Sequence, residues 1–168
     1  MKGCVAVLDI GKTNTKLVVF DPAGKIVAER SQDSAPLKPD AGWPYLRLDT
    51  ERACAFYLAA LKDVGLRYPI EAISVAAHGA AGVLVTEAGV AAPPVDYEFD
   101  GFAAVDAEYD ALRPPFGESL APNLPRGLNL GRQIFYVERR FPEAFAQASA
   151  FLAWPQYWSW RLSGVMAS

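Results

Sequence analysis

The chain has 168 residues, of which 52% are apolar, and its 16 Lys and Arg against 19 Asp and Glu give a net charge of −3. This length fits one domain with a core of its own, and the slightly acidic balance argues against a nucleic-acid partner. There is no uninterrupted apolar run of 18 residues and no N-terminal signal segment, so we expect a cytoplasmic protein without a membrane partner.

The first expected element is a β-hairpin with a polar turn. Two apolar, β-branched runs, residues 5–10 and 17–20, flank the turn. The residues at and beside the turn combine what a phosphate chain needs, namely close backbone approach, small hydrogen-bond donors and positive charge: Gly11, Lys12, Thr13, Asn14, Thr15 and Lys16. The turn therefore predicts a binding site for nucleotide phosphates.

Asp9, at the end of the first run, is a candidate metal residue. Mg²⁺ keeps several waters and usually joins one or two carboxylates to substrate phosphates, so a single aspartate is enough, acting through water. The same spacing also suits an ordinary polar hairpin that is capped by Asp9. The chain contains neither GxxxxGK[ST] nor GxGxxG, so the turn is not one of the two common phosphate loops.

The following elements predict the fold class. They are a third antiparallel strand at 25–31, an irregular segment at 33–48, an amphipathic helix from 49 or 50 to about 64, and a strand at 70–77. Trp43 and Tyr45 are expected to anchor the irregular segment rather than to touch a ligand. A three-strand antiparallel meander followed by a helix and a parallel strand is the order of a ribonuclease H-like α/β domain, with a mixed sheet and flanking helices.

A second candidate site follows the strand at 70–77. Open α/β sheets bind ligands beyond the carboxyl ends of their strands, and the segment 76–82 lies there. Its small residues are expected to leave room for a substrate, and His78, the only histidine of the chain, is the one large polar group in it. A loop histidine that hydrogen-bonds to the backbone is the alternative.

Three carboxylates alternate with apolar residues at 95–101. In an extended chain Asp96, Glu98 and Asp100 would share one face. Carboxylates accept hydrogen bonds from sugar hydroxyls, and an aromatic ring such as that of Tyr97 packs on the C–H face of a sugar. The segment therefore predicts a sugar-binding edge, with a solvated acidic loop as the alternative.

The rest of the chain is expected to be mainly helical and to belong to the core. The expected elements are a strand at 83–86, a helix at 103–112 and a loop at 116–128 that is rich in proline and glycine. They are followed by a helix ending at Arg140, a helix from Pro142 to about 150, and a helix with Pro155 in its first turn and Gly164 after its last. The tryptophans of the last helix are expected in the core. Cys4 and Cys54 do not have CxxC spacing and are expected to be buried free thiols rather than part of a disulfide or a metal site.

The stretch LDIGKTNTKLVVFD, residues 8–21, resembles the first phosphate motif of the actin, sugar kinase and heat-shock ATPase superfamily, and in particular that of the FGGY carbohydrate kinases. His78-Gly79 and the run at 161–164, RLSG, also resemble FGGY motifs, so the resemblance covers essentially the whole chain. It implies that Asp9 organises Mg²⁺, that Gly11, Thr13 and Lys16 approach the phosphates of ATP, and that His78 contacts sugar hydroxyls. The family commonly has an arginine after the acidic residue of the 95–101 segment, and none follows here.

The resemblance implies transfer of the γ-phosphoryl of ATP to a hydroxyl of a sugar, for example a pentulose or a deoxyhexulose. Residues 1–168 would be the N-terminal, sugar-binding half, and the general-base aspartate and the C-terminal ATP-binding domain are expected beyond it, so this chain alone should be inactive. The alternatives are an actin-like or heat-shock-like ATPase and a non-catalytic sugar-binding regulatory module. A homodimer is left open.

Overall fold

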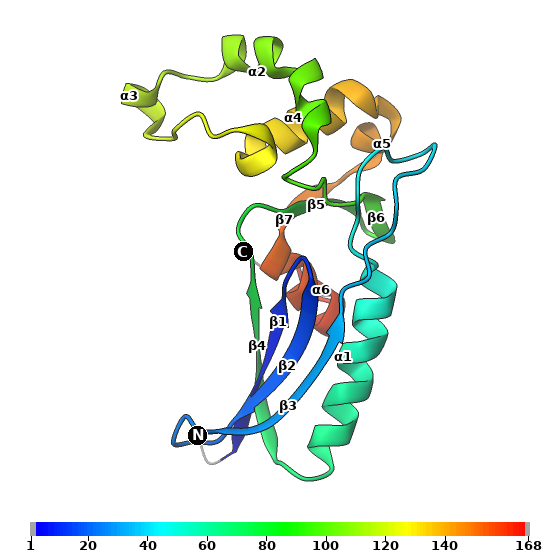
Figure 1. The fold of residues 1–168 in the computed structure, drawn as a ribbon, viewed down its shortest axis with the longest axis vertical. Coiled ribbons are helices and arrows are strands. Elements are labelled where there is room, and N and C mark those ends of the chain that lie inside the picture. The colour runs from blue at the N-terminus through cyan, green and yellow to red at the C-terminus, as the bar shows by residue number, and fades with distance from the viewer. Residues whose placement is uncertain (1–2, 167–168) are drawn as a thin grey trace. The chain divides into compact units, whose positions relative to one another are not determined.

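The chain folds into two compact units in a computed structural model that describes residues 3–166 (Figure 1). Within the described residues, unit 1 contains 3–37, Leu48–His78 and 158–166, and unit 2 contains Lys38–Arg47 and Gly79–Tyr157. The expected single domain therefore consists of two packed parts that are interleaved in sequence.

Unit 1 is built on a four-stranded mixed sheet. Its strands are β1 (Cys4–Ile10), β2 (Asn14–Phe20), β3 (Ile26–Asp33) and β4 (Ile70–Ala77), in the order β3-β2-β1-β4 (Figure 1). Neighbouring strands of the meander are antiparallel, whereas β1 and β4 are parallel. The predicted fold class, a meander followed by a helical crossover and a parallel strand, is confirmed.

Helix α1 (Thr50–Gly65) makes that crossover and covers one face of the sheet. The Asp49 side chain caps it by accepting a hydrogen bond from the backbone N–H of Arg52 at 2.9 Å. Burial alternates along β1, so that one face of the sheet is apolar and packed while the other reaches solvent. The core of unit 1 consists of side chains with no exposed surface: Ala6, Leu8, Leu17, Val19, Tyr57 and Val64.

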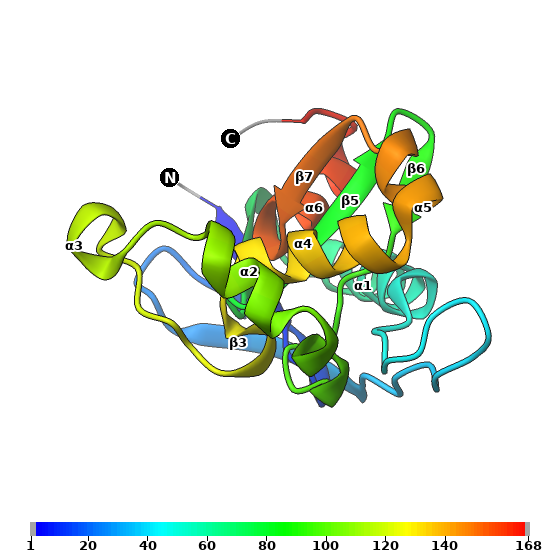
Figure 2. The same cartoon turned by 90° about the horizontal axis from the view of Figure 1, so that it is seen from above.

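Unit 2 contains a second sheet, which is antiparallel throughout. Strands β5 (Gly82–Thr86), β6 (Gly89–Ala92) and β7 (Ala150–Ala153) pair in the order β6-β5-β7 (Figure 2). The sequence predicted a strand at the position of β5 but neither β6 nor β7. A strand of four residues is too short to show alternation, and β7 pairs with a strand far away in the sequence.

Helices and short turns complete unit 2. They are η1 (Asp100–Ala104), α2 (Asp106–Leu112), α3 (Phe116–Ser119), η2 (Arg126–Leu128), α4 (Leu130–Arg140) and α5 (Pro142–Gln147), and α6 (Trp154–Ser163) begins in unit 2 and ends in unit 1. The helix predicted at 103–112 is broken at Val105, and α5 ends earlier than predicted because β7 follows it. Trp43 lies 4.6 Å from the ring of Phe141, between ring centroids, and Tyr45 is buried, which confirms that both anchor their segment.

Several smaller predictions can also be settled. Trp154 and Trp158 are buried, as expected for core residues, whereas Trp160 is only partly buried. Cys4 and Cys54 are free thiols, as expected, and Cys4 is buried whereas Cys54 is only partly so. In the part of the chain that the structure describes, none of the helices has the length and apolar composition needed to cross a bilayer.

Candidate functional site

The turn between β1 and β2 is tight and depends on a glycine. The backbone N–H of Gly11 donates to the carbonyl of Asn14 at 2.9 Å and so closes the hairpin. A Cβ atom at position 11 would lie 2.9 Å from that same carbonyl oxygen, which is closer than real Cβ atoms come. Glycine is therefore required where the turn folds back on itself.

Ser34, directly after β3, stabilises the turn through two hydrogen bonds. Its Oγ donates to the carbonyl of Gly11 at 3.0 Å, and its backbone N–H donates to the carbonyl of Thr13 at 2.9 Å. The carbonyls of Gly11 and Thr13 thus accept hydrogen bonds from Ser34. These bonds keep the negative ends of the two carbonyls away from an incoming anion. The sequence analysis missed Ser34, because a serine after a strand carries no signal of its own.

The predicted phosphate residues fall into two groups. Thr13 and Asn14 are exposed, and Lys12 is half-buried beside them. Thr15 is fully buried, and its hydroxyl lies 3.2 Å from that of Ser34. The expectation that Thr15 faces a phosphate is therefore corrected: strand alternation turns its side chain into the core, where it supports the turn.

Asp9 and Lys16 lie side by side on the solvent face of the sheet. They are direct partners in the register of β1 and β2, so their side chains project from the same face, and Asp9 is exposed. The Nζ atom of Lys16 also lies 3.9 Å from a carboxylate oxygen of Glu29. An exposed carboxylate, a cation and small donors thus gather at one end of the hairpin.

The backbone at Asp9 is fixed by a buried tyrosine of α1. The Tyr57 hydroxyl donates to the carbonyl of Asp9 at 3.0 Å. Burial, reinforced by the negative charge of Asp9, raises the pKa of Tyr57 far above its usual value. The hydroxyl therefore stays protonated and keeps donating at any physiological pH.

Asp9 suits a metal ion whose other ligands are water and phosphate oxygens rather than protein side chains. Among the described residues there is no cluster of three or more His, Cys, Asp or Glu side chains that could enclose an ion. A site made by protein side chains alone is thus not seen in residues 3–166. A single exposed carboxylate beside the turn suits Mg²⁺ that arrives with phosphates and water.

The loop after β4 is only partly open. His78 is half-buried, and a Cβ atom at the next residue, Gly79, would meet nothing within 4 Å. A Cβ atom at Gly82 would lie 2.0 Å from the ring of Phe151. There is thus open space beside Gly79, but the expectation that small residues leave room for a substrate is wrong at Gly82, where the glycine makes room for the ring of Phe151.

The acidic segment at 95–101 is a turn and not an extended edge. The Asp96 side chain accepts a hydrogen bond from the backbone N–H of Glu98 at 3.0 Å, and the carbonyl of Asp96 accepts one from Phe99 N–H at 2.9 Å. Asp100 then begins η1. The prediction that the three carboxylates share one face is wrong, because aspartate side chains readily close such turns.

A distant arginine supplies a cation to this segment. Arg126 Nε lies 3.0 Å from a carboxylate oxygen of Asp100, and both side chains are largely exposed. The sequence analysis looked for an arginine directly after the acidic residues and found none. The structure brings one in from η2, which sequence spacing could not indicate.

The meander, the crossover helix and the parallel strand, with an aspartate and a glycine turn between β1 and β2, define the fold that sugar kinases share with actin-like ATPases. No family model and no curated protein sequence matches the chain.

Solved structures of kinases do match it. A carbohydrate kinase from Novosphingobium aromaticivorans is 34% identical with a TM-score of 0.87, and the alignment covers 99% of this chain and 35% of that enzyme. A xylulose kinase from Rhodospirillum rubrum (20% identity, TM-score 0.78, 98% and 35% covered) and a gluconate kinase from Lactobacillus acidophilus (17%, 0.79, 97% and 34%) share the fold. The chain spans about a third of the length of these enzymes and matches the N-terminal part of carbohydrate kinases of the FGGY family.

Proposed function

We propose that the protein to which this chain belongs transfers the γ-phosphoryl group of ATP to a hydroxyl of a sugar. The observation that carries the proposal is the match to a carbohydrate kinase at 34% identity over nearly the whole chain. The arrangement of Asp9, Lys16 and the Gly11 turn on one end of the sheet supports it, because these groups suit a phosphate chain.

Each residue of the turn has a proposed task. Phosphoryl transfer needs positioning and charge neutralisation more than covalent chemistry from the protein. Lys12 and Lys16 would offset phosphate charge, and Thr13 and Asn14 would donate hydrogen bonds. Mg²⁺, when bound, would neutralise charge on the phosphates, and Asp9 is the residue that would hold it through water.

The sugar would be recognised by residues of the two later segments. His78 would contact sugar hydroxyls after β4, and Asp96, Glu98 and Asp100 would accept hydrogen bonds from them at the turn of unit 2. Tyr97 would offer its ring to the C–H face of the sugar. We assign none of these residues the role of general base, and we expect residues 1–168 alone to be inactive.

The proposal is tested with the full-length protein and a panel of ketoses, aldoses and polyols. We expect sugar-dependent release of ADP with at least one ketose, such as a pentulose or a deoxyhexulose, and a phosphorylated product in equal amount. ATP hydrolysis that no sugar stimulates would contradict the proposal and would favour an ATPase of the actin-like type. Sugar binding without any ATP turnover would favour a regulatory module.

A further inference from the structure

Helix α4 buries two adjacent polar side chains, Arg132 and Gln133, which are 3% and 2% exposed. A buried amide costs free energy unless its hydrogen bonds are satisfied, so the partners of Gln133 show what its burial achieves. These partners lie in the loop after β4 and in η2, and not in α4 itself.

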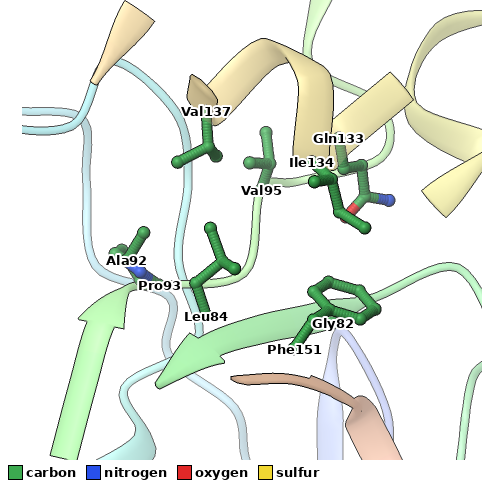
Figure 3. Close-up of a pocket in the computed structure, with 9 residues that line it drawn as sticks. All are labelled: Gly82, Leu84, Ala92, Pro93, Val95, Gln133, Ile134, Val137 and Phe151. Carbon is green, nitrogen blue, oxygen red and sulfur yellow. The ribbon is translucent and has the colours of Figure 1, made fainter. Parts of the chain in front are cut away.

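The Gln133 side chain joins those two segments directly. Its Nε2 donates to the carbonyl of Ala80 at 2.9 Å and to the carbonyl of Gly127 at 2.5 Å. Two carbonyls can only accept, so the amide nitrogen must face them and the orientation of the amide is fixed. Gln133 Oε1 has no hydrogen-bond partner among the described residues, and the side chain lines a small, mainly apolar cavity of about 10 Å³ (Figure 3).

The contact at Gly127 continues to the acidic turn. The backbone N–H of Gly127 donates to the carbonyl of Tyr97 at 3.0 Å. A Cβ atom at position 127 would lie 2.9 Å from Tyr97 Cα and 2.5 Å from the ring of Phe102, so the two segments touch without space between them. One side chain, through a single intervening residue, therefore connects the loop that follows His78 to the turn that carries Tyr97.

We propose that Gln133 is a positioning residue that fixes the separation between the loop at 79–82 and the turn at 96–100. This inference rests on the proposed function, in which both segments recognise the sugar. Gln133 does not touch the sugar, since it is buried, and it acts through Ala80 and Gly127. A shift of about 1 Å in a recognition segment can cost up to about a hundredfold in rate.

The test compares Gln133→Met with Gln147→Met in the full-length protein. Methionine keeps the length of the side chain and removes the amide. Gln147, the last residue of α5 in unit 2, is the control because its side chain is exposed, so the same change from amide to thioether there should alter neither loop. If Gln133→Met does not fold, Gln133→Asn replaces it, since asparagine keeps the amide but is one methylene too short to reach both carbonyls.

For Gln133→Met we expect kcat/KM for the sugar to fall at least about tenfold while the KM for ATP stays within about twofold. Gln147→Met should leave both constants near the wild-type values. Equal effects of the two substitutions on the sugar constants would overturn the inference, because they would mean that Gln133 contributes only to stability.

A second measurement does not depend on the reaction. Hydrogen exchange of the backbone amides at 79–82 and 96–100, and of Gly127 in particular, should become faster in Gln133→Met and not in Gln147→Met. Unchanged exchange there would overturn the positioning role whatever the enzyme does. Faster exchange in a protein that phosphorylates no sugar would instead uphold the link between the loops and reject the proposed function.

Discussion

The two units of this chain are held together by different kinds of contact. In unit 1, β1, β2 and β3 pair with their neighbours in sequence, and a single helix leads to β4. In unit 2, β5 pairs with β7 across most of the unit's sequence, and buried polar side chains of α4 tie the loops together. Local patterns are therefore sufficient to define unit 1, whereas unit 2 depends on contacts that no short segment contains.

The largest effect is expected in unit 1, at Asp9 beside the turn between β1 and β2. In the full-length protein, Asp9→Asn should lower the turnover of sugar phosphorylation by about 10²–10³-fold, because it removes the charge that would hold hydrated Mg²⁺. The fold should be unchanged, since Asp9 is exposed. Steady-state assays at saturating ATP and sugar, with a thermal unfolding curve for each variant, measure both effects.

Asp21→Asn is the matched control for this prediction. Asp21 follows β2, at the end of the hairpin opposite the turn, and its carboxylate accepts hydrogen bonds from the backbone N–H groups of Ala23 and Lys25 at 2.9 Å. Its loss should affect stability slightly and turnover not at all. If Asp9→Asn kept more than a tenth of the wild-type turnover, the proposed role of the turn would have to be abandoned.

The next effect concerns stability and belongs to unit 2. The Arg132 guanidinium donates to the carbonyls of Leu124 and Arg126 at 2.5 and 2.6 Å, and it lies 3.2 Å from Asp106. Arg132→Met leaves these partly buried acceptors without their donor, so we expect the free energy of unfolding in urea to fall by about 2–3 kcal/mol. The loss stays below that of a fully buried pair because Asp106 is partly exposed.

Arg139→Met, on the same helix, is the control. Arg139 makes exposed ion pairs with Glu108 and Glu138, and such pairs contribute at most about 1 kcal/mol. Similar losses for the two arginines would show that unit 2 does not depend on its buried polar contacts, and the contrast between the units would disappear.

The sequence was sufficient to predict the elements of unit 1 that depend on local patterns, but not those of unit 2 that depend on long-range contacts. The two apolar, β-branched runs at 5–10 and 17–20 and the polar, glycine-containing turn between them were enough to place the hairpin, its turn and Asp9. Strands β6 and β7, each of four residues, were not predicted, because their pairing with β5 is a property of the assembled unit.

The site residues show the same division. The exposed members of the turn were identified from their chemistry, but the burial of Thr15 and the supporting role of Ser34 require the third strand to be in place. The acidic residues at 96–100 were found, yet their turn geometry and the approach of Arg126 were not. Residue types indicate which ligand a segment could bind. Long-range packing determines which side chains are exposed to that ligand.

The smallest effect compares one buried tyrosine in each unit. Burial raises the pKa of both Tyr57 and Tyr45 far above the usual value. Below about pH 10, the pKa of tyrosine in the unfolded chain, both states keep the proton and the free energy of unfolding does not depend on these groups. Above it, only the unfolded state loses the proton, so the free energy of unfolding should fall by about 1.4 kcal/mol per pH unit for each tyrosine.

The two tyrosines differ in their hydrogen bonds at neutral pH. Tyr57 donates to the carbonyl of Asp9 at 3.0 Å, whereas the distance from the Tyr45 hydroxyl to the carbonyl of Pro93 is 3.4 Å. Tyr57→Phe should therefore cost about 1 kcal/mol at pH 7 and Tyr45→Phe clearly less, and each should reduce the loss of stability above pH 10. Urea unfolding at pH 7 and pH 11 measures both quantities. A larger cost for Tyr45→Phe at pH 7 would mean that the hydrogen bond under Asp9 does not support the end of β1.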